Sequence, residues 1–164
     1  MSASTVTSRF IKARPEKVYR AFMDPNALVA WLPPGEMTGR LHDFNGSEGG
    51  GYRMSLFYPA SETEMRGKTT ALEDMVDVRF VELRPSRRIV EAVTFHSADP
   101  AFAGVMRIEI RFDAVLDGTE VTFICSDIPS GITPADNDAG TRLSLEQLAR
   151  YVEGSSSPDK GSVK

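Results

Sequence analysis

The sequence predicts an α+β fold in which a curved antiparallel sheet of about six to seven strands wraps around one long C-terminal helix. Two observations carry this prediction. Residues 134–152 place Leu145, Leu148 and Val152 at i, i+3 and i+7, which gives a helix one apolar stripe. Between Leu41 and Ser126, runs of apolar residues are broken by turn residues, a pattern typical of strands. A helix lying in a curved sheet often leaves an apolar hollow, so this fold favours binding of a small molecule.

Length and charge fit one globular domain. The 164 residues are enough to bury a single sizeable core. We expect one domain over 5–153, a flexible N-terminus over 1–4 and a disordered tail over 154–164, which is rich in Ser, Gly, Lys and Asp. Nineteen basic and 23 acidic side chains give a net charge of -4, so the composition argues against nucleic acid as a partner.

The single cysteine and the absence of long apolar runs predict a cytoplasmic protein. Cys125 has no second cysteine with which to form an internal disulfide, which suits a reducing compartment. Residues 1–9 lack the apolar core of a signal peptide. The sequence also contains no run of about 18 apolar residues, which a membrane-spanning helix requires, so we expect no insertion into a membrane.

The N-terminal part predicts a strand followed by two short helices. Residues 5–11 form the strand, with Val6, Phe10 and Ile11 as its anchors. Pro15 suits the first turn of a helix, and Asp24 caps the second helix, which ends before Pro33-Pro34. The apolar residues at helical spacing are Val18, Ala21, Phe22, Leu28 and Trp31.

The central part predicts strands joined by tight turns. The turns fall at Asn45-Gly46, Gly49 to Gly51, Pro85-Ser86 and Asp117-Gly118. The clearest strand covers residues 106–114, where apolar residues alternate with Arg107, Glu109, Arg111 and Asp113. The inward set predicted from this alternation is Val76, Val78, Phe80, Met106, Ile108, Ile110, Phe112, Ala114, Val121, Phe123 and Cys125. Pro100 to Gly104 is predicted to be a loop that carries Phe102, and 130–139 a polar linker.

Four motifs in this order resemble a known superfamily. They are Pro15 to Trp31 before Pro33-Pro34, Gly49-Gly50-Gly51-Tyr52 opening a strand, Phe80 to Pro85 before Arg88-Ile89, and Gly118 to Thr122. The chain resembles the SRPBCC (START-like) superfamily, and within it the branch of the activator of the heat-shock chaperone ATPase, typified by small bacterial single-domain proteins. The resemblance covers about residues 5–153.

The resemblance implies a helix-grip fold with a cavity between the sheet and the C-terminal helix, roofed by the two short helices. Relatives include lipid-transfer domains, polyketide cyclases and co-chaperones, so the fold alone selects no activity. Many members of the branch carry Gly-Trp at the start of the last helix, whereas here Gly140 precedes Thr141. This departure predicts a differently shaped cavity, or one filled by another residue such as Trp31.

Several chemical signatures are absent or weak. Gly46 and Gly49 to Gly51 precede a strand and no lysine, so turn or bulge glycines explain them better than a phosphate loop. His42 and His96 lack the spacing of a triad or a metal site, and Cys125 is in phase with core residues. We therefore assign no catalytic residue, no metal ligand and no cofactor.

Glu91 leaves two alternatives open. In the strand over 88–95 it shares a face with Ile89, Val93 and Phe95, which would bury the carboxyl as a ligand contact or an acid/base group. Alternatively Val90, Ala92 and Thr94 face inward and Glu91 is solvated. Arg53 is a possible partner of Glu91 if it points inward in place of Tyr52.

The predicted ligand pocket combines apolar and amphipathic side chains from the sheet and helices. Its residues are Trp31, Phe44, Tyr52, Arg53, Met54, Phe80, Glu91, Phe95, Met106, Phe123, Thr141 and Leu148. Core packing explains most of these positions equally well. Glu62-Thr63-Glu64 and Met65 belong to a loop that could act as a lid, although a plain surface loop explains it as well.

The function predicted from these residues is binding of a small apolar or amphipathic molecule by a monomer or homodimer. The alternatives are a co-chaperone that regulates a heat-shock chaperone ATPase, as the resemblance implies, and an enzyme of cyclase or dehydratase type. The enzyme would need a buried acid/base pair that the sequence pattern does not establish.

Overall fold

The computed structural model describes residues 3–59, 72–154 and 161–163. Its elements are β1 (Ala3–Ile11), α1 (Pro15–Met23), α2 (Pro25–Trp31), β2 (Thr38–Asn45), β3 (Gly51–Phe57), β4 (Glu73–Arg84), β5 (Arg88–Phe95), the 3-10 turn η1 (Pro100–Phe102), β6 (Met106–Val115), β7 (Gly118–Ile128), α3 (Pro134–Val152) and β8 (Gly161–Val163). The fold is the predicted α+β helix grip, with a long helix on a curved antiparallel sheet.

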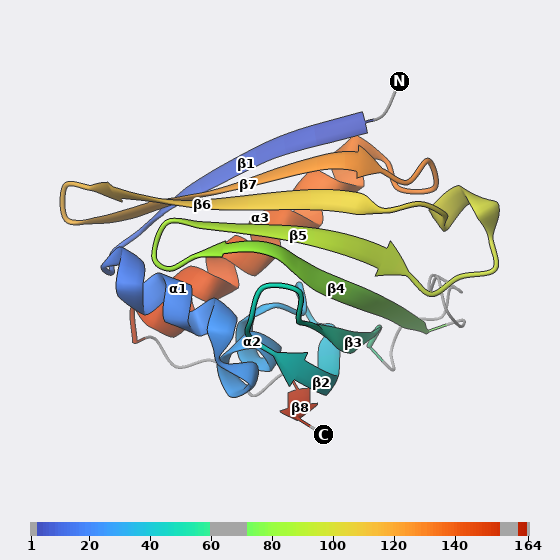
Figure 1. Ribbon diagram of the computed structural model, residues 1–164, viewed down its shortest axis with the longest axis horizontal. Coiled ribbons are helices and arrows are strands. Elements are labelled where there is room, and N and C mark those ends of the chain that lie inside the picture. Colours follow the sequence, from blue (N-terminus) through green and yellow to red (C-terminus); the bar gives the residue numbers. More distant parts are fainter. Residues whose placement is uncertain (1–2, 60–71, 155–160, 164) are drawn as a thin grey trace.

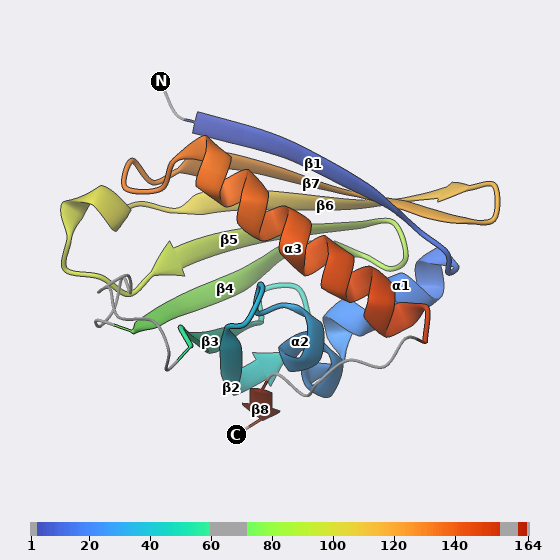
Figure 2. The ribbon, with the colours of Figure 1, turned by 180° about the vertical axis from the view of Figure 1, so that it is seen from behind.

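The described strands form one sheet in the order β1-β7-β6-β5-β4-β3-β2-β8. All neighbours pair antiparallel except β8, which lies parallel to β2. Figure 1 shows the sheet from its outer face, and Figure 2 shows α3 crossing the inner face obliquely toward α1. The three α-helices of the described chain therefore lie on one side, and the sheet is a single layer with two different faces.

The tail contributes one pairing that the sequence did not suggest. Gly161 to Val163 form β8 beside Gly39, Arg40 and Leu41 of β2, within the stretch 154–164 for which we expected no order. Residues 155–160 lie outside the described part of the chain. The pairing places the end of the described chain next to the last strand of the antiparallel sheet.

The two short helices begin as predicted. Pro15 occupies the first turn of α1, and the Asp24 side chain caps α2 by accepting a hydrogen bond from the backbone N–H of Asn26 at 2.9 Å. Both helices bury the apolar residues predicted for their inner faces, which are Val18, Ala21, Phe22, Leu28 and Trp31. The core continues from these helices onto the sheet and α3.

The strand alternation is confirmed over the centre of the sheet, where Val76, Val78, Phe80, Ile110 and Cys125 are buried. The prediction for β1 is wrong at two of its three anchors. Val6 is 65% exposed and Phe10 46% exposed, because β1 directs Thr5, Thr7 and Ile11 toward α3. Thr7 donates a hydrogen bond to Asp138 of α3, so a polar contact holds this strand where we expected an apolar one.

Candidate functional site

The strand register places a row of side chains across the middle of the inner face. Thr5 lies opposite Cys125, Cys125 opposite Ile108, Ile108 opposite Glu91, and Glu91 opposite Phe80. The row therefore runs over β1, β7, β6, β5 and β4. It combines apolar side chains with a carboxyl group, a thiol and a hydroxyl on the face that α3 crosses (Figure 2).

Glu91 points inward, which decides between the two alternatives for β5. Its side chain is only 6% exposed, and within the described residues no hydrogen-bond donor reaches its carboxyl. Burial raises the pKa of this carboxyl from its ordinary value of 4.5 to about 8, because an ionised carboxylate is poorly solvated there. Glu91 is consequently a neutral carboxylic acid at neutral pH.

Tyr52 of β3 also points inward and is 8% exposed. Its ring stacks on Phe44 with centroids 6.0 Å apart and meets Phe80 edge-on at 5.9 Å. Burial, and secondly the charge that Glu91 can carry, hold the pKa of the phenol well above its ordinary value of 10. Among the described residues, its hydroxyl has no hydrogen-bond partner, so Tyr52 and Glu91 offer two unused polar groups on one apolar face.

A small polar cluster closes the other end of the row, between the sheet and the first turns of α3. Asn137 donates a hydrogen bond to the Thr5 hydroxyl at 2.9 Å, and the Thr141 hydroxyl donates to the Asn137 carbonyl at 2.8 Å. Burial raises the pKa of the Cys125 thiol, while the neighbouring polar groups of Asn137, Thr5 and Thr141 oppose the shift. Cys125 is therefore a buried neutral thiol, and Thr141 lies on the inner side of α3.

The sequence left open whether Arg53 or Tyr52 points inward, and the structure places Arg53, one of the predicted pocket residues, on the outer face. Because successive side chains of a strand alternate, the inward position of Tyr52 sends Arg53 to the outer face. There the Arg53 guanidinium binds Asp77 at 2.7 Å, and its side chain is 46% exposed. Because Arg53 lies on the outer face, it is not available to pair with Glu91.

Trp31 lies in the packed core. Its Nε1 donates a hydrogen bond to the Ala21 carbonyl at 2.9 Å, and its ring meets Phe22 at 4.7 Å. Phe22 also packs toward Phe112 and Phe123. The polar tip of Trp31 is thus already satisfied, and the residue roofs the apolar core with little of its surface exposed.

The remaining predicted pocket residues divide between the inner face and the helix. Met54 and Met106 are buried on the inner face, with Phe44 and Phe95 half-buried at its margin, while Leu148 is fully buried on α3. The structure brings Phe44, Tyr52, Phe80 and Glu91 into one neighbourhood. The predicted lid residues, Glu62-Thr63-Glu64 and Met65, lie outside the described residues.

Sequence patterns missed the polar contacts that fix α3 above α2. The Gln147 amide donates to the carbonyls of Trp31 and Pro33, both at 2.7 Å, and its oxygen accepts from the Gly35 N–H at 2.9 Å. The Ser144 hydroxyl donates to the Leu32 carbonyl at 2.8 Å. The sequence feature that could have predicted these contacts is the pair Ser144 and Gln147, polar residues at i and i+3 inside the apolar stripe of the helix.

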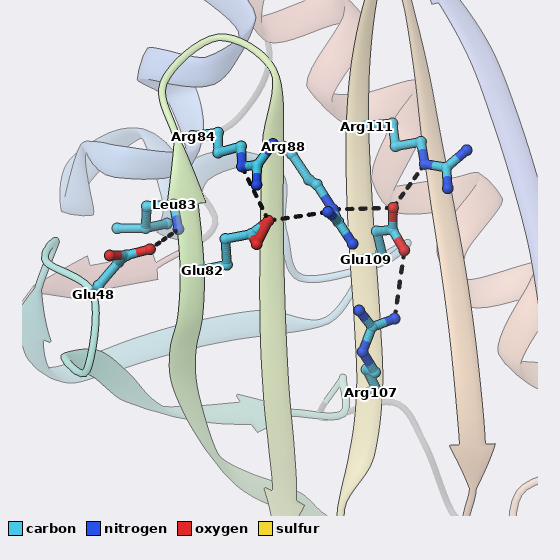
Figure 3. Close-up of polar contacts among 8 residues, drawn as sticks. All are labelled: Glu48, Glu82, Leu83, Arg84, Arg88, Arg107, Glu109 and Arg111. Carbon is cyan, nitrogen blue, oxygen red and sulfur yellow. Dashed lines mark hydrogen bonds and ion pairs between the residues drawn. The ribbon is translucent and has the colours of Figure 1, made fainter.

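The outer face carries an ion-pair cluster that the sequence also left undetected (Figure 3). Glu109 is 5% exposed and lies between Arg88, Arg107 and Arg111, with its closest ion pair to Arg111 at 2.7 Å. Hydrogen bonding from Arg111 lowers the pKa of Glu109, against the effect of burial. The sequence feature that could have predicted this cluster is the spacing of Arg107, Glu109 and Arg111, which places all three side chains on the same face of one strand.

Arg88 links this glutamate to a second one. Its guanidinium lies 3.1 Å from both Glu82 and Glu109, while Arg84 lies 3.5 Å from Glu82. Within the described residues the Glu82 Oε2 and Arg88 Nε atoms have no well-aligned hydrogen bond, so these contacts are ion pairs by distance only. Val90 lies opposite Glu82 and Glu109 in the strand pairing, so it sits beneath this ion-pair cluster and is 3% exposed.

Both histidines make side-chain hydrogen bonds that are typical of a structural role. The His42 ring bonds the Ser55 hydroxyl at 2.9 Å, and the His96 ring bonds Asp77 at 2.7 Å on the outer face. The described residues contain no group of three His, Cys, Asp or Glu side chains placed to bind a metal ion.

A depression of about 430 Å³ lies where residues 12–15 meet the β6–β7 turn, away from Glu91 and Tyr52.

In the part of the chain that the structure describes, no helix is long and apolar enough to cross a membrane.

Comparisons with known proteins give one family and several similar structures. Residues 12–153 match the family described as "Activator of Hsp90 ATPase homolog 1-like protein". A crystal structure from Chromobacterium violaceum is 31% identical, with a TM-score of 0.80, and the alignment covers 92% of this chain and 96% of that one. A search of curated proteins gave no match.

Two more distant structures support the fold alone. A Mesorhizobium loti protein aligns with a TM-score of 0.70 at 17% identity, over 94% of this chain and 100% of that one. A Staphylococcus epidermidis protein, solved in solution, aligns with a TM-score of 0.71 at 18% identity, over 92% of this chain and 90% of that one.

Proposed function

Because this chain belongs to the activator of Hsp90 ATPase homolog 1-like family, we propose that it binds a small apolar or amphipathic molecule between the inner face of the sheet and α3. The wider fold family is known for ligand binding. The observation that carries the proposal for this chain is the pair Glu91 and Tyr52. Both are buried on an apolar face, and within the described residues neither polar group is hydrogen-bonded.

Burial of such groups is costly, so they favour a polar head on the ligand. A fully buried donor or acceptor without a partner costs about 1–3 kcal/mol, and these two groups, which are 6% and 8% exposed and keep slight contact with solvent, cost less than that. A ligand that supplies the hydrogen bonds recovers that free energy, and its apolar part is accommodated by side chains such as Phe44, Met54 and Met106. We place this activity in the cytoplasm, since the protein's one thiol, Cys125, is reduced and buried.

Thermal denaturation with a panel of apolar and amphipathic compounds tests the proposal. A compound present at about 100 times its Kd should raise the Tm by roughly 5–10 °C, and the shift should saturate. If no compound class gives a saturable shift, the proposal is wrong.

The Thr141→Trp variant locates the ligand. Thr141 lies on the inner side of α3 beside Cys125, so an indole there projects into the space between helix and sheet and should abolish the shift. The matched control is Thr94→Trp, which adds the same bulk at an exposed position on the outer side of β5 and should keep the shift. Unchanged binding by a folded Thr141→Trp protein would place the ligand elsewhere.

A second candidate function is regulation of a heat-shock chaperone ATPase, which the family's description favours. Co-purification of the chain with the chaperone ATPase, together with a change in ATP turnover on addition of the pure protein, would support it. The two candidates separate in the Thr141→Trp variant, because this inner-face change should leave a chaperone contact on the molecular surface intact.

A further inference from the structure

Glu91 and Tyr52 lie on neighbouring positions of the inner face, with β4 between them. Tyr52 of β3 pairs with Val78, and Glu91 of β5 pairs with Phe80, two residues further along β4 on the same face. Neighbouring strands are about 4.8 Å apart and successive residues of a strand about 3.3 Å apart, so the two side chains start from backbone positions roughly 12 Å apart on a diagonal, and both are long enough to extend toward each other above Val78 and Phe80. The influence of Glu91 on the pKa of Tyr52 agrees with this convergence.

Both groups have a proton to donate. Burial keeps the carboxyl of Glu91 and the phenol of Tyr52 neutral at pH 7, as their raised pKa values show. A neutral carboxylic acid and a phenol each present one O–H donor. Two such donors on an apolar surface are suited to one acceptor atom, because a carbonyl oxygen has two lone pairs.

The charge of the site selects against ionised ligands. Arg53, the cation that the sequence offered as a possible partner of Glu91, lies on the outer face paired with Asp77. A ligand carboxylate would therefore be desolvated beside Glu91 without a compensating positive charge, which is unfavourable. An uncharged acceptor meets the two donors without this penalty.

From this arrangement we propose that Glu91 and Tyr52 jointly donate hydrogen bonds to the carbonyl oxygen of an uncharged apolar ketone, ester or amide. The inference rests on the proposed function and specifies the chemical class of its ligand. The Phe44, Tyr52 and Phe80 rings, whose centroids are 5.9–6.0 Å apart, form the apolar surface for the part of the ligand next to the carbonyl.

Prodan, a neutral fluorescent ketone whose emission moves to longer wavelength when its carbonyl accepts a hydrogen bond, is the direct probe. Wild-type protein should bind it saturably with emission at longer wavelength than prodan in alkane. Tyr52→Phe and Glu91→Leu should each weaken binding about tenfold and move the emission to shorter wavelength. Glu91→Gln should retain most of the affinity, because its amide N–H still donates.

Competition with unlabelled compounds separates this inference from the proposed function. Methyl nonyl ketone should displace prodan at least about tenfold better than undecane or decanoate. Equal displacement by ketone and alkane, together with unchanged binding by Tyr52→Phe and Glu91→Leu, would overturn the carbonyl assignment while leaving ligand binding intact. No saturable binding of any of these compounds would overturn both.

The pH dependence identifies Glu91 as one of the donors. The titratable groups that face it are Tyr52 from β3 and Cys125 from β7, and the pKa values of both lie above their ordinary values of 10 and 9. The other elements present Phe80, Ile108, Asn137 and Thr141 there. Between about pH 6 and pH 9 Glu91 is thus the group that loses its proton and its donor.

Prodan affinity should accordingly fall as the pH rises through about 8 in the wild type and stay level in Glu91→Gln. Glu120→Gln on the outer face and Tyr151→Phe on α3 are the matched controls, since both side chains are exposed. A wild-type affinity that does not change between pH 6 and pH 9, or a Glu91→Gln affinity that falls in the same way as the wild type, would overturn the role of Glu91.

Discussion

Glu91 is held on the inner face by its strand, although no group in the described part of the chain stabilises a charge on it. Ile89 and Val93 on the same side are buried, which fixes the direction of the side chain between them. Burial alone raises the pKa of its carboxyl to about 8. The residue therefore costs the fold stability at any pH where the unfolded chain would ionise it.

The sign of the resulting pH dependence follows from the two pKa values. Between pH 4.5 and about 8 the folded protein keeps a proton on Glu91 that the unfolded chain has released, so the free energy of unfolding falls as the pH rises. The Glu91→Gln variant lacks this titration. Its stability relative to wild type should increase by about 3–5 kcal/mol from about pH 5 to about pH 8, measured by urea unfolding.

The matched control for this comparison is Glu120→Gln, an exposed glutamate on the outer side of β7. Its stability relative to wild type should change little over the same interval. A Glu91→Gln difference that is the same at both pH values would show that the folded protein ionises Glu91 as readily as the unfolded chain does.

The orientation of Glu91 could not be decided from the sequence, because β5 is buried on both faces. Ile89 and Val90 are 0% and 3% exposed, so neither alternating set stands out. Val90 lies opposite Glu82 and Glu109, the two glutamates of the outer-face ion-pair cluster, and no local sequence pattern predicts its burial there. The same ambiguity affected Tyr52 and Arg53, where the pairing with β2 and β4 decides which one points inward.

At the scale of elements, α3 is fixed at both ends by polar contacts. Near its start, Asn137 and Asp138 bond Thr5 and Thr7 of β1. Toward its end, Gln147 bonds the last residue of α2 and the segment that follows it. The apolar stripe between these contacts was enough to predict Pro134 to Val152 as a helix on the sheet, whereas its tilt and height above β1 and α2 depend on the polar contacts.

Replacing Gln147 tests this attachment. Gln147→Leu removes two donated hydrogen bonds and one accepted one at a position that is 9% exposed, and should lower the free energy of unfolding by about 2–4 kcal/mol. The measurement is denaturant unfolding, with hydrogen exchange of the Gly35 amide as a local readout. That amide should exchange faster in the variant.

Gln147→Glu provides the matched comparison because it keeps an oxygen for the Gly35 N–H and loses the donors to Trp31 and Pro33. Its Gly35 amide should remain protected while its stability falls. Equal stability of Gln147→Leu and wild type would mean that apolar packing alone positions α3.

At the scale of the whole molecule, the helix-grip fold could be predicted because the sequence features that specify it are spread over many positions. Alternating strands, capped short helices and one amphipathic helix each contribute, so the errors at Val6 and Phe10 did not change the architecture. The candidate site depends on a few side chains whose roles follow from register. That is why the orientation of Glu91, and the choice between Tyr52 and Arg53 as the inward residue, stayed open.

The single-layer sheet gives its two faces opposite responses to acid, and Glu109 provides the test. Hydrogen bonding to Arg111 lowers the pKa of Glu109, so its stabilising contribution is present above pH 4.5 and is lost as the pH falls through the lower folded value. Glu91 on the inner face has the reverse sign.

Glu109→Gln should therefore be less stable than wild type by about 1–2 kcal/mol at pH 7, a modest value because Arg107 and Arg111 are 44% and 54% exposed. The deficit should shrink below about pH 4 and also in 1 M NaCl, where the Debye length is about 3 Å. Glu91→Gln should respond oppositely to pH and weakly to salt, because its penalty comes from burial. Urea unfolding of both variants at the two pH values and two salt concentrations checks this, and a salt-independent deficit in Glu109→Gln would show that packing, and not charge, keeps Glu109 among the arginines.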